Sequence, residues 1–281
     1  MAGSSMKDIK LRIKSVESTM QITKAMQLVA TSKLRRAKER MENSKPYADI
    51  SSAAMKAAVR SCAGEKVPFA EQRDIKNTCF VVIAGERGLA GGYNANIFKR
   101  VAQEAGNQPC CVLPLGRKAI EKYQRLGVPL LNADYAHVEG LSVSACYKLA
   151  KRLIDGYSAA EFDRVVLVYT SFRNMLSQEV TAVQLLPLEP EAEEHPRPVS
   201  TVYEPEAAET LAHVMPDFLA GRLYSAVCDS YVSEVSARRT AMDSATKNAG
   251  DMISSLSLKY NRARQGAITQ EITEIVAGAE Q

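Results

Sequence analysis

A repeating stripe near the start of the chain constrains the fold more than any other feature. From Ile9 onward, mostly apolar residues recur alternately four and three positions apart. The stripe comprises Ile9, Ile13, Val16, Met20, Thr23, Gln27, Ala30, Leu34, Ala37 and Met41. This spacing places all its members on one face of an α-helix, and only a second helix can bury such a face along its whole length.

The partner helix is expected at the opposite end of the chain, where the same spacing returns. Its members are Ile268, Ile272, Ile275 and Ala279, after an alanine-rich run with Ala237, Ala241, Ala245 and Ala249. The two terminal segments are therefore predicted to form one antiparallel coiled coil.

The expected ends of these helices follow from turn and breaker residues. The first helix should run from about residue 7 past residue 60, with a kink or local break at Pro46. The last should run from about residue 205 to about residue 277, and Pro216 and Gly221 favour an interruption of its early turns.

Between the helices, strand and helix patterns alternate. Short apolar runs predict strands at residues 79–84, 110–115, near 130, 165–169 and 179–186, and amphipathic runs predict helices at 95–105, 117–126 and 143–155. This alternation is typical of a small α/β domain with a mostly parallel sheet. The predicted organisation is a coiled-coil helix over residues 1–62, an α/β domain over 76–195 and a second coiled-coil helix over 205–281.

Composition narrows the class of protein. An apolar fraction of 46% in 281 residues is ample for a packed core. No run approaches the roughly 18 to 20 apolar residues that span a bilayer, and the first six residues lack the features of a secretory signal. The six cysteines show no C-x-x-C spacing, which favours reduced, buried thiols over disulfides or a zinc site. These features indicate a cytosolic protein, or one peripheral to a membrane.

Charge is distributed unevenly although the net charge is only +4. Residues 7–45 contain eleven Lys or Arg and four acidic residues, a balance of 11 − 4 = +7. A proline-broken stretch is acidic instead, with Glu189, Glu191, Glu193, Glu194, Glu204, Glu206 and Glu209 against Arg197. Each run is either a solvated surface or, for the basic helix, a surface that meets an acidic partner.

A glycine-rich turn at residues 85–94 lies between a predicted strand and a predicted helix, the place where a dinucleotide would bind. Its spacing is G-x-x-G-x-x-G-G, which differs from the dinucleotide pattern, and Glu104 lies on the following helix rather than at a strand end. A tight turn that lets strand and helix approach closely is the favoured interpretation, and no cofactor is expected.

Other catalytic chemistry is sparse. His137, His195 and His213 are isolated, and no hydrolase motif or pair of carboxylates accompanies them. Nucleic-acid binding is not expected, because the first 46 residues contain no aromatic residue and the chain has no Trp. We therefore predict no catalytic residue and no metal site.

Three motifs resemble those of one protein family. They are QITKAMQLVA at residues 21–30, RGLAGGYN at 87–94, and YNRARQ at 260–265 followed by ITQEITEI at 268–275. Together they closely resemble the gamma subunit of the rotary F-type ATP synthase, in order and spacing over essentially the whole chain. The chloroplast type carries an additional insertion with a close cysteine pair, which this sequence lacks.

The resemblance implies a non-catalytic shaft that couples rotation of a membrane ring to conformational change in a catalytic hexamer. Its partners would be the alpha and beta subunits of that hexamer, the epsilon subunit and the c-type ring, and its Rossmann-like α/β domain would lie below the hexamer. The implied location is peripheral, on the cytoplasmic face of the bacterial inner membrane.

The resemblance also implies contact residues. Met26 would pack near an acidic loop of a beta subunit, although a methionine at this position is equally explained as a seam or core residue. The residues facing the hexamer would further include Arg238, Arg264, Gln265 and Thr269, whereas Tyr203 and Glu204 would lie at the foot, against the ring or the epsilon subunit.

Two other interpretations remain open from the residues alone. A non-rotary coiled-coil scaffold could carry a pendant α/β domain and tether partners, and a divergent dinucleotide oxidoreductase could use the glycine-rich turn. A tether would tolerate substitutions in the last turns of its terminal helix, whereas an oxidoreductase would bind a nicotinamide cofactor as an isolated chain.

Overall fold

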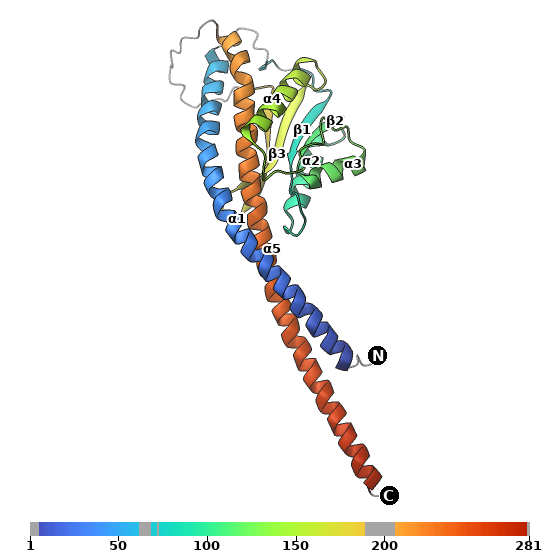
Figure 1. Ribbon diagram of the computed structural model, residues 1–281. Helices are drawn as coiled ribbons and strands as arrows, with labels where there is room; N and C mark the ends of the chain where they lie inside the picture. Colours follow the sequence, from blue (N-terminus) through green and yellow to red (C-terminus); the bar gives the residue numbers. More distant parts are fainter. Residues whose placement is uncertain (1–5, 62–68, 72, 189–205, 280–281) are drawn as a thin grey trace. The chain divides into compact units, whose positions relative to one another are not determined.

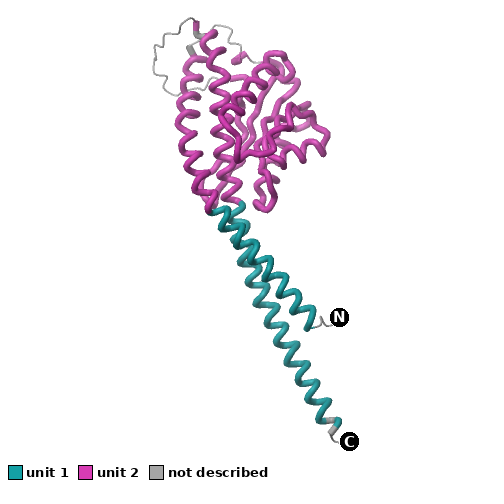
Figure 2. The backbone as a smooth tube through the Cα atoms, in the orientation of Figure 1, with its two compact units in different colours: residues 1–31, 238–281 teal, residues 32–237 magenta. Residues whose placement is uncertain are grey.

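The structure is a computed structural model that describes residues 6–61, 69–71, 73–188 and 206–279. It divides into two compact units, one formed by Met1–Thr31 with Arg238–Gln281 and the other by Ser32–Ala237 (Figure 2). We call the first the helix-pair unit and the second the sheet unit. The two long helices contribute to both units.

These long helices are α1, Met6–Ser61, and α5, Ala207–Ala279 (Figure 1). Both are unbroken, so the interruptions predicted at Pro216 and Gly221 and the local break considered at Pro46 are wrong, whereas a kink at Pro46 stays a prediction. A proline inside a helix costs about 3 kcal/mol. Packing on both sides compensates, because Ser44 and Ala48 flank Pro46 and both are buried.

Gly221 has a positive packing role in α5. A Cβ atom at this position would lie only 2.4 Å from Cε1 of Tyr47 on α1. The absence of a side chain therefore allows the Tyr47 ring to lie against the backbone of α5, and helix–helix contact offsets the low helix propensity of glycine.

The sheet unit contains the alternating elements that the sequence predicts. They are β1 Thr78–Ile83, α2 Tyr93–Ala105, β2 Cys110–Leu115, α3 Arg117–Leu126, α4 Val143–Ser158, β3 Arg164–Phe172 and β4 Gln178–Leu186. The strand order is β2-β1-β3-β4, with β1 parallel to β2 and β3, and β4 antiparallel to β3. The mostly parallel sheet is confirmed. The strand expected near residue 130 is reduced to a single bridge between Val112 and Leu130.

The two faces of this sheet are covered differently. Phe80 and Val82 of β1 point to the face that packs against Ile97 and Val101 of α2. Cys79, Val81 and Ile83 point to the other face, which packs against α4 and α5. Both faces of the central strands are thus buried, as the continuous apolar runs of β1 and β3 predict.

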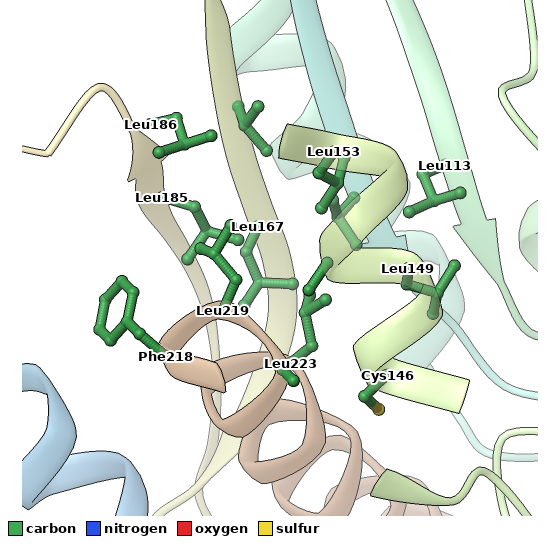
Figure 3. Close-up of a cluster of buried hydrophobic side chains, with 14 of the residues drawn as sticks. Leu113, Cys146, Leu149, Leu153, Leu167, Leu185, Leu186, Phe218, Leu219 and Leu223 are labelled. Carbon is green, nitrogen blue, oxygen red and sulfur yellow. The ribbon is translucent and has the colours of Figure 1, made fainter. Parts of the chain in front are cut away.

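The long helix α5 forms part of this core. Figure 3 shows Leu219 and Leu223 of α5 pointing toward Leu167 of β3 and the helix α4, and Phe218 of α5 belongs to the same buried cluster. Complete burial of each such leucine stabilises the fold by about 2 kcal/mol. The core therefore joins α5 to the sheet as one packed body within the sheet unit.

Candidate partner-binding surfaces

The predicted seam of α1 is confirmed. All ten of its residues are buried or half-buried, whereas neighbours such as Arg12 and Ile22 are exposed. Within the helix-pair unit, α5 presents a seam with the same alternation of spacing. It consists of Arg239, Met242, Thr246, Ala249, Ile253, Leu256, Tyr260 and Ala263, each buried or half-buried. Long N- and C-terminal helices packed together are therefore confirmed.

Pairing stops before the end of α5. The hydroxyl oxygens of Thr23 and Thr246 are 2.8 Å apart. Because antiparallel helices advance equally, Met6, 17 residues before Thr23, lies opposite about residue 246 + 17 = 263. The described part of α1 therefore ends its pairing with α5 near Ala263.

The predicted pairing of Ile268, Ile272 and Ile275 with the N-terminal stripe is wrong. These side chains are 47%, 56% and 66% exposed, respectively. Two physical causes act together. The described α1 does not extend far enough, and continuation of the α5 seam after Ala263 would require residues 267, 270 and 274, which lie out of phase with the three isoleucines.

We call residues 264–276 the unpaired end of α5. Every side chain in this range is exposed. Among the described residues, the side chains of Arg264 and Gln265 make no hydrogen bond or ion pair, and the Thr269 hydroxyl donates to the Gln265 carbonyl at 2.9 Å. A single helix that exposes both apolar and polar side chains around its circumference presents an extensive surface to a partner.

The other residues named by the resemblance occupy different places. Met26 and Arg238 are half-buried on α1 and α5 of the helix-pair unit, and both adjoin seam positions. Tyr203 and Glu204 lie outside the described residues. The structure therefore brings Met26 and Arg238 to the paired part of the unit, and Arg264, Gln265 and Thr269 to the unpaired end.

The basic residues of α1 lie mainly on the surface. In the helix-pair unit, Lys7, Lys10, Arg12, Lys14 and Lys24 are all exposed, and the neighbouring acidic residues of α1 there are Asp8 and Glu17. This exposed excess of positive charge favours contact with an acidic partner, and salt would weaken that attraction.

The glycine-rich turn brings β1 close to α5 within the sheet unit. Gly85 donates its backbone N–H to the Asn94 side-chain oxygen at 2.8 Å, and a Cβ on Gly85 would lie 2.8 Å from Oε1 of the buried Glu234. The hydroxyl of Tyr93 lies 2.7 Å from Oγ of Ser230. The prediction of a tight turn that lets strand and helix approach closely is confirmed. The turn also lies against the long helix α5.

A polar attachment of α5 to the sheet was not predicted. Asp229 accepts hydrogen bonds from the Phe172 N–H at 2.7 Å and from the Ser171 hydroxyl at 3.0 Å. Ser233 donates to the Thr170 carbonyl at 3.1 Å. Burial raises the pKa of Asp229, although these hydrogen bonds oppose the shift. Polar residues within an otherwise apolar stretch of helix were the available signal for this contact.

A second attachment, through Arg40, was also missed. Its guanidinium donates to the carbonyls of Glu139 and Leu141 and, at 2.9 Å, to the Tyr224 hydroxyl. Lys33 forms an ion pair with Glu139 at 2.6 Å. Burial raises the pKa of Glu139, but the hydrogen bonds from Lys33 and Tyr231 and the positive charges of Lys33 and Arg87 together outweigh burial, so the net shift is downward. The loop before α4 is thereby fastened to both long helices.

The described residues contain no cluster of three or more His, Cys, Asp or Glu side chains suited to a metal ion. Cys79, Cys111, Cys146 and Cys228 are buried free thiols, as predicted, and Cys110 is half-buried. Burial raises the pKa of Cys146 to about 12, which keeps it a neutral thiol. Within the described ranges, no helix has the length and apolar composition that a membrane-crossing segment requires.

The chain combines two long packed helices, a mostly parallel α/β domain and an unpaired helix end. This combination is typical of a coiled-coil subunit that assembles with other proteins. Comparison with known proteins identifies its family. The family profile described as ATP synthase matches residues 5–281. The chain belongs to the ATP synthase gamma chain family, whose members are non-catalytic rotor subunits in the central stalk of the F-type enzyme.

Bacterial relatives match over nearly their whole length. The chain is 42% identical to the ATP synthase gamma chain of Ruminococcus albus over 280 residues, covering 97% of this chain and 96% of the relative. It is also 42% identical to that of Desulforamulus reducens over 280 residues, covering 98% of both chains.

Solved structures show the same architecture. A chain of the Tetrahymena thermophila mitochondrial ATP synthase, in a structure of the central stalk and c-ring, matches with a TM-score of 0.61 and 26% identity. The match covers 80% of this chain and 99% of that one. A chain from the Euglena gracilis mitochondrial ATP synthase matches with a TM-score of 0.66 and 17% identity, over 97% of this chain and 92% of that one. At this identity the match supports only the similarity of fold.

Proposed function

We propose that this chain is the central rotor shaft of a proton-driven ATP synthase. It couples rotation of a membrane ring to conformational cycling of catalytic sites in a hexamer of alpha and beta subunits. Met26, Arg238, Arg264, Gln265 and Thr269 contact the hexamer. The proposal rests on family membership and on one structural observation, the unpaired end of α5.

The unpaired end supports this role because it is a helix without a core of its own. Isolated helices of this length are marginal in water, and most helical stability comes from packing of an apolar face. Ile268, Ile272 and Ile275 are exposed here. A surrounding sleeve of partner subunits would bury them and would bring carboxylates within reach of Arg264.

Coupling then follows from symmetry. A ring of three catalytic pairs around an asymmetric helix presents each pair with a different face of the shaft. Each site is biased toward a different conformation, with a different nucleotide affinity, and rotation exchanges these states. The shaft itself forms and breaks no covalent bond in this mechanism.

The remaining partners and the location are part of the same proposal. Tyr203 and Glu204 contact the c-type ring or the epsilon subunit, and the chain lies peripherally on the cytoplasmic face of a bacterial inner membrane. Support comes from the bacterial relatives and from the Tetrahymena structure, which contains a central stalk with a c-ring.

The test is the double variant Arg264→Ala/Gln265→Ala in the purified ATP synthase complex. Neither side chain has a hydrogen-bonding partner among the described residues, so folding and helix pairing should be unaffected. ATP turnover should fall by about tenfold for each 1.4 kcal/mol of differential stabilisation that is lost from the rate-limiting step. Steady-state ATPase activity per mole of complex measures this, with assembly quantified on gels.

Glu271→Ala is the matched control, since it is exposed on the same unpaired end but is not among the proposed contacts. It should retain normal turnover. Wild-type turnover of the double variant at normal assembly would favour a passive tether over a rotor. Loss of assembly would show that the two residues act as structural contacts instead.

The oxidoreductase interpretation has its own test. Fluorescence titration of the isolated chain with a nicotinamide dinucleotide should show no saturable binding, because Glu234 and Asn94 already contact Gly85 in the glycine-rich turn. Saturable binding, abolished by a bulky substitution at Gly88, would contradict the assignment of this turn to packing.

A further inference from the structure

Polar side chains cross the seam of the helix pair over two helical turns. The hydroxyls of Thr23 and Thr246 are 2.8 Å apart, and Gln27 Nε2 donates to Asp243 Oδ1 at 2.9 Å. One turn further along, Arg239 Nε donates to the Thr31 hydroxyl at 3.2 Å. We call these six residues the polar layer: Thr23, Gln27, Thr31, Arg239, Asp243 and Thr246.

The contacts follow one another in antiparallel order. On α1 the members are four residues apart, and their partners on α5 recede from residue 246 through 243 to 239. In the seam, Thr23 and Gln27 lie between the apolar Met20 and the buried Ala30, and Thr31 is exposed beside Ala30. Sliding one helix by a single turn, about 5.4 Å, would break all three contacts together and leave at most two new polar pairs, for example Gln27 with Thr246 and Thr31 with Asp243.

Apolar seam contacts do not discriminate registers in this way. An alanine or isoleucine that moves by one turn meets another small or apolar side chain, whereas a buried donor that loses its acceptor costs about 1 to 3 kcal/mol. Thr23 is only 8% exposed, so its hydroxyl cannot readily exchange its partner for water. Polar seam residues are known to specify register at a cost in stability.

Asp243 is the centre of the layer. Its Oδ1 accepts from Gln27 of α1, and its Oδ2 lies 2.8 Å from Nζ of Lys247 on its own helix. The hydrogen bond with Lys247 lowers its pKa, and Gln27 and the charge of Arg239 act in the same direction. The group therefore remains an ionised acceptor at neutral pH, fixed between the two helices.

We propose that the polar layer fixes the register of α1 and α5 under load, and that Asp243 is its central positioning residue. This inference rests on the proposed rotor function, because torque applied to a helix pair tends to slide one helix past the other. Met26 and Arg238 adjoin the layer in sequence. A fixed register therefore fixes the alignment of these two contact residues on opposite helices.

Engineered cysteine pairs report the register in the assembled enzyme. The observed alignment places Met20 opposite about residue 249, since 23 − 20 = 3 and 246 + 3 = 249. Met20→Cys with Ala249→Cys is therefore the in-register pair, and Met20→Cys with Ile253→Cys is the pair shifted by one turn. Mild oxidation during ATP hydrolysis, followed by peptide mass spectrometry, quantifies each disulfide.

With the native polar layer, only the in-register pair should cross-link during turnover. With Thr23→Leu/Gln27→Leu, the shifted pair should cross-link at least severalfold more, and proton pumping per ATP hydrolysed should fall. Asp243→Leu should behave like the double variant. Asp243→Asn should restore the native pattern, because its side-chain oxygen still accepts from Gln27.

Each alternative result is decisive. Shifted cross-links with the native layer, or none with the leucine variants and intact pumping, would overturn the proposal. Shifted cross-links in the leucine variants that are equal with and without ATP would support register control by the layer. That result would contradict the rotor function, since no load would then act on the helices.

Discussion

Residues 207–237 and 238–276 of α5 belong to one helix but have different surroundings. The first stretch buries residues around most of its circumference, including the five consecutive residues from Val232 through Ser236. The second buries one stripe as far as Ala263 and then none. Secondary structure is the same in both, so tertiary neighbours alone decide which side chains leave water.

The difference also appears in the residue types. The sheet-unit stretch supplies large side chains such as Leu219, Leu223 and Val227, whereas the helix-pair seam relies on Ala249 and Thr246 between larger residues. Large buried side chains give rigid attachment to the sheet. Small and polar seam residues give close helix pairing and leave the outer surface of the pair available to partners.

The largest effect is expected in the sheet unit, from Gly116→Ala. Gly116 has φ of 98°, and a Cβ there would lie 2.1 Å from the Ala84 carbonyl oxygen, which is backbone and cannot move aside. Strain and overlap together should lower the free energy of unfolding by about 3 kcal/mol or more. Urea denaturation of the purified chain measures the change.

Gly140→Ala is the control for that substitution, because a Cβ there would have no heavy atom within 4 Å. Its stability should remain within about 0.5 kcal/mol of the native chain. Equal losses at the two glycines would show that the contact between Gly116 and Ala84 does not restrain the sheet.

A pair of truncations sharpens the contrast between the units. Leu153→Ala removes a fully buried side chain of the sheet unit and should cost about 3 kcal/mol. Met20→Ala removes a half-buried seam side chain and should cost about 1 kcal/mol. Similar losses by denaturant titration would contradict the difference in packing between the two units.

A smaller effect is expected from Arg40→Lys. A lysine retains the charge but cannot reach the Glu139 carbonyl, the Leu141 carbonyl and Tyr224 together in the fixed geometry of a guanidinium. The loss should be about 1 to 2 kcal/mol. Hydrogen exchange of residues 139–142 should accelerate, and unchanged exchange would show that this loop is held by other contacts.

The smallest effect is expected from Asp229→Asn, and its sign depends on pH. Burial raises the pKa of Asp229 in the folded state above its unfolded-state value of about 4. The protonated carboxyl therefore contributes fully to stability below about pH 4, and this contribution is lost as pH rises through the folded-state pKa. Asparagine does not ionise. The stability of the native chain relative to the variant should therefore fall between pH 3 and pH 7 in urea titrations, and a rise would contradict the assigned shift.

Much of the architecture could be predicted from sequence because its signals are local. The ends of β2 and α3 were predicted correctly. A glycine with positive φ lies immediately before α3, at Gly116, and another immediately after it, at Gly127. Periodicity likewise identified ten residues of α1, from Ile9 to Met41, that are buried or half-buried. These features depend on neighbours within one or two turns of the chain.

The failures concern contacts between distant residues. Arg40 binds the Leu141 carbonyl across 101 positions, and Asp229 binds the Phe172 N–H across 57 positions. No local pattern encodes such pairings. The end of the helix pair was missed for a related reason, because it depends on the relative phase and extent of two helices rather than on the stripe of either one. The assigned contacts of Met26, Arg238 and the unpaired end remain predictions.

Hydrogen–deuterium exchange of α5 tests the central claim most directly, by comparing the chain alone at low concentration with the assembled ATP synthase. Residues 242–256, paired with α1 in both states, serve as the internal reference. Residues 264–276 should exchange rapidly in the isolated chain and become strongly protected in the complex, because partner subunits bury this end. Protection already present in the isolated chain, or rapid exchange that persists in the complex, would contradict the account.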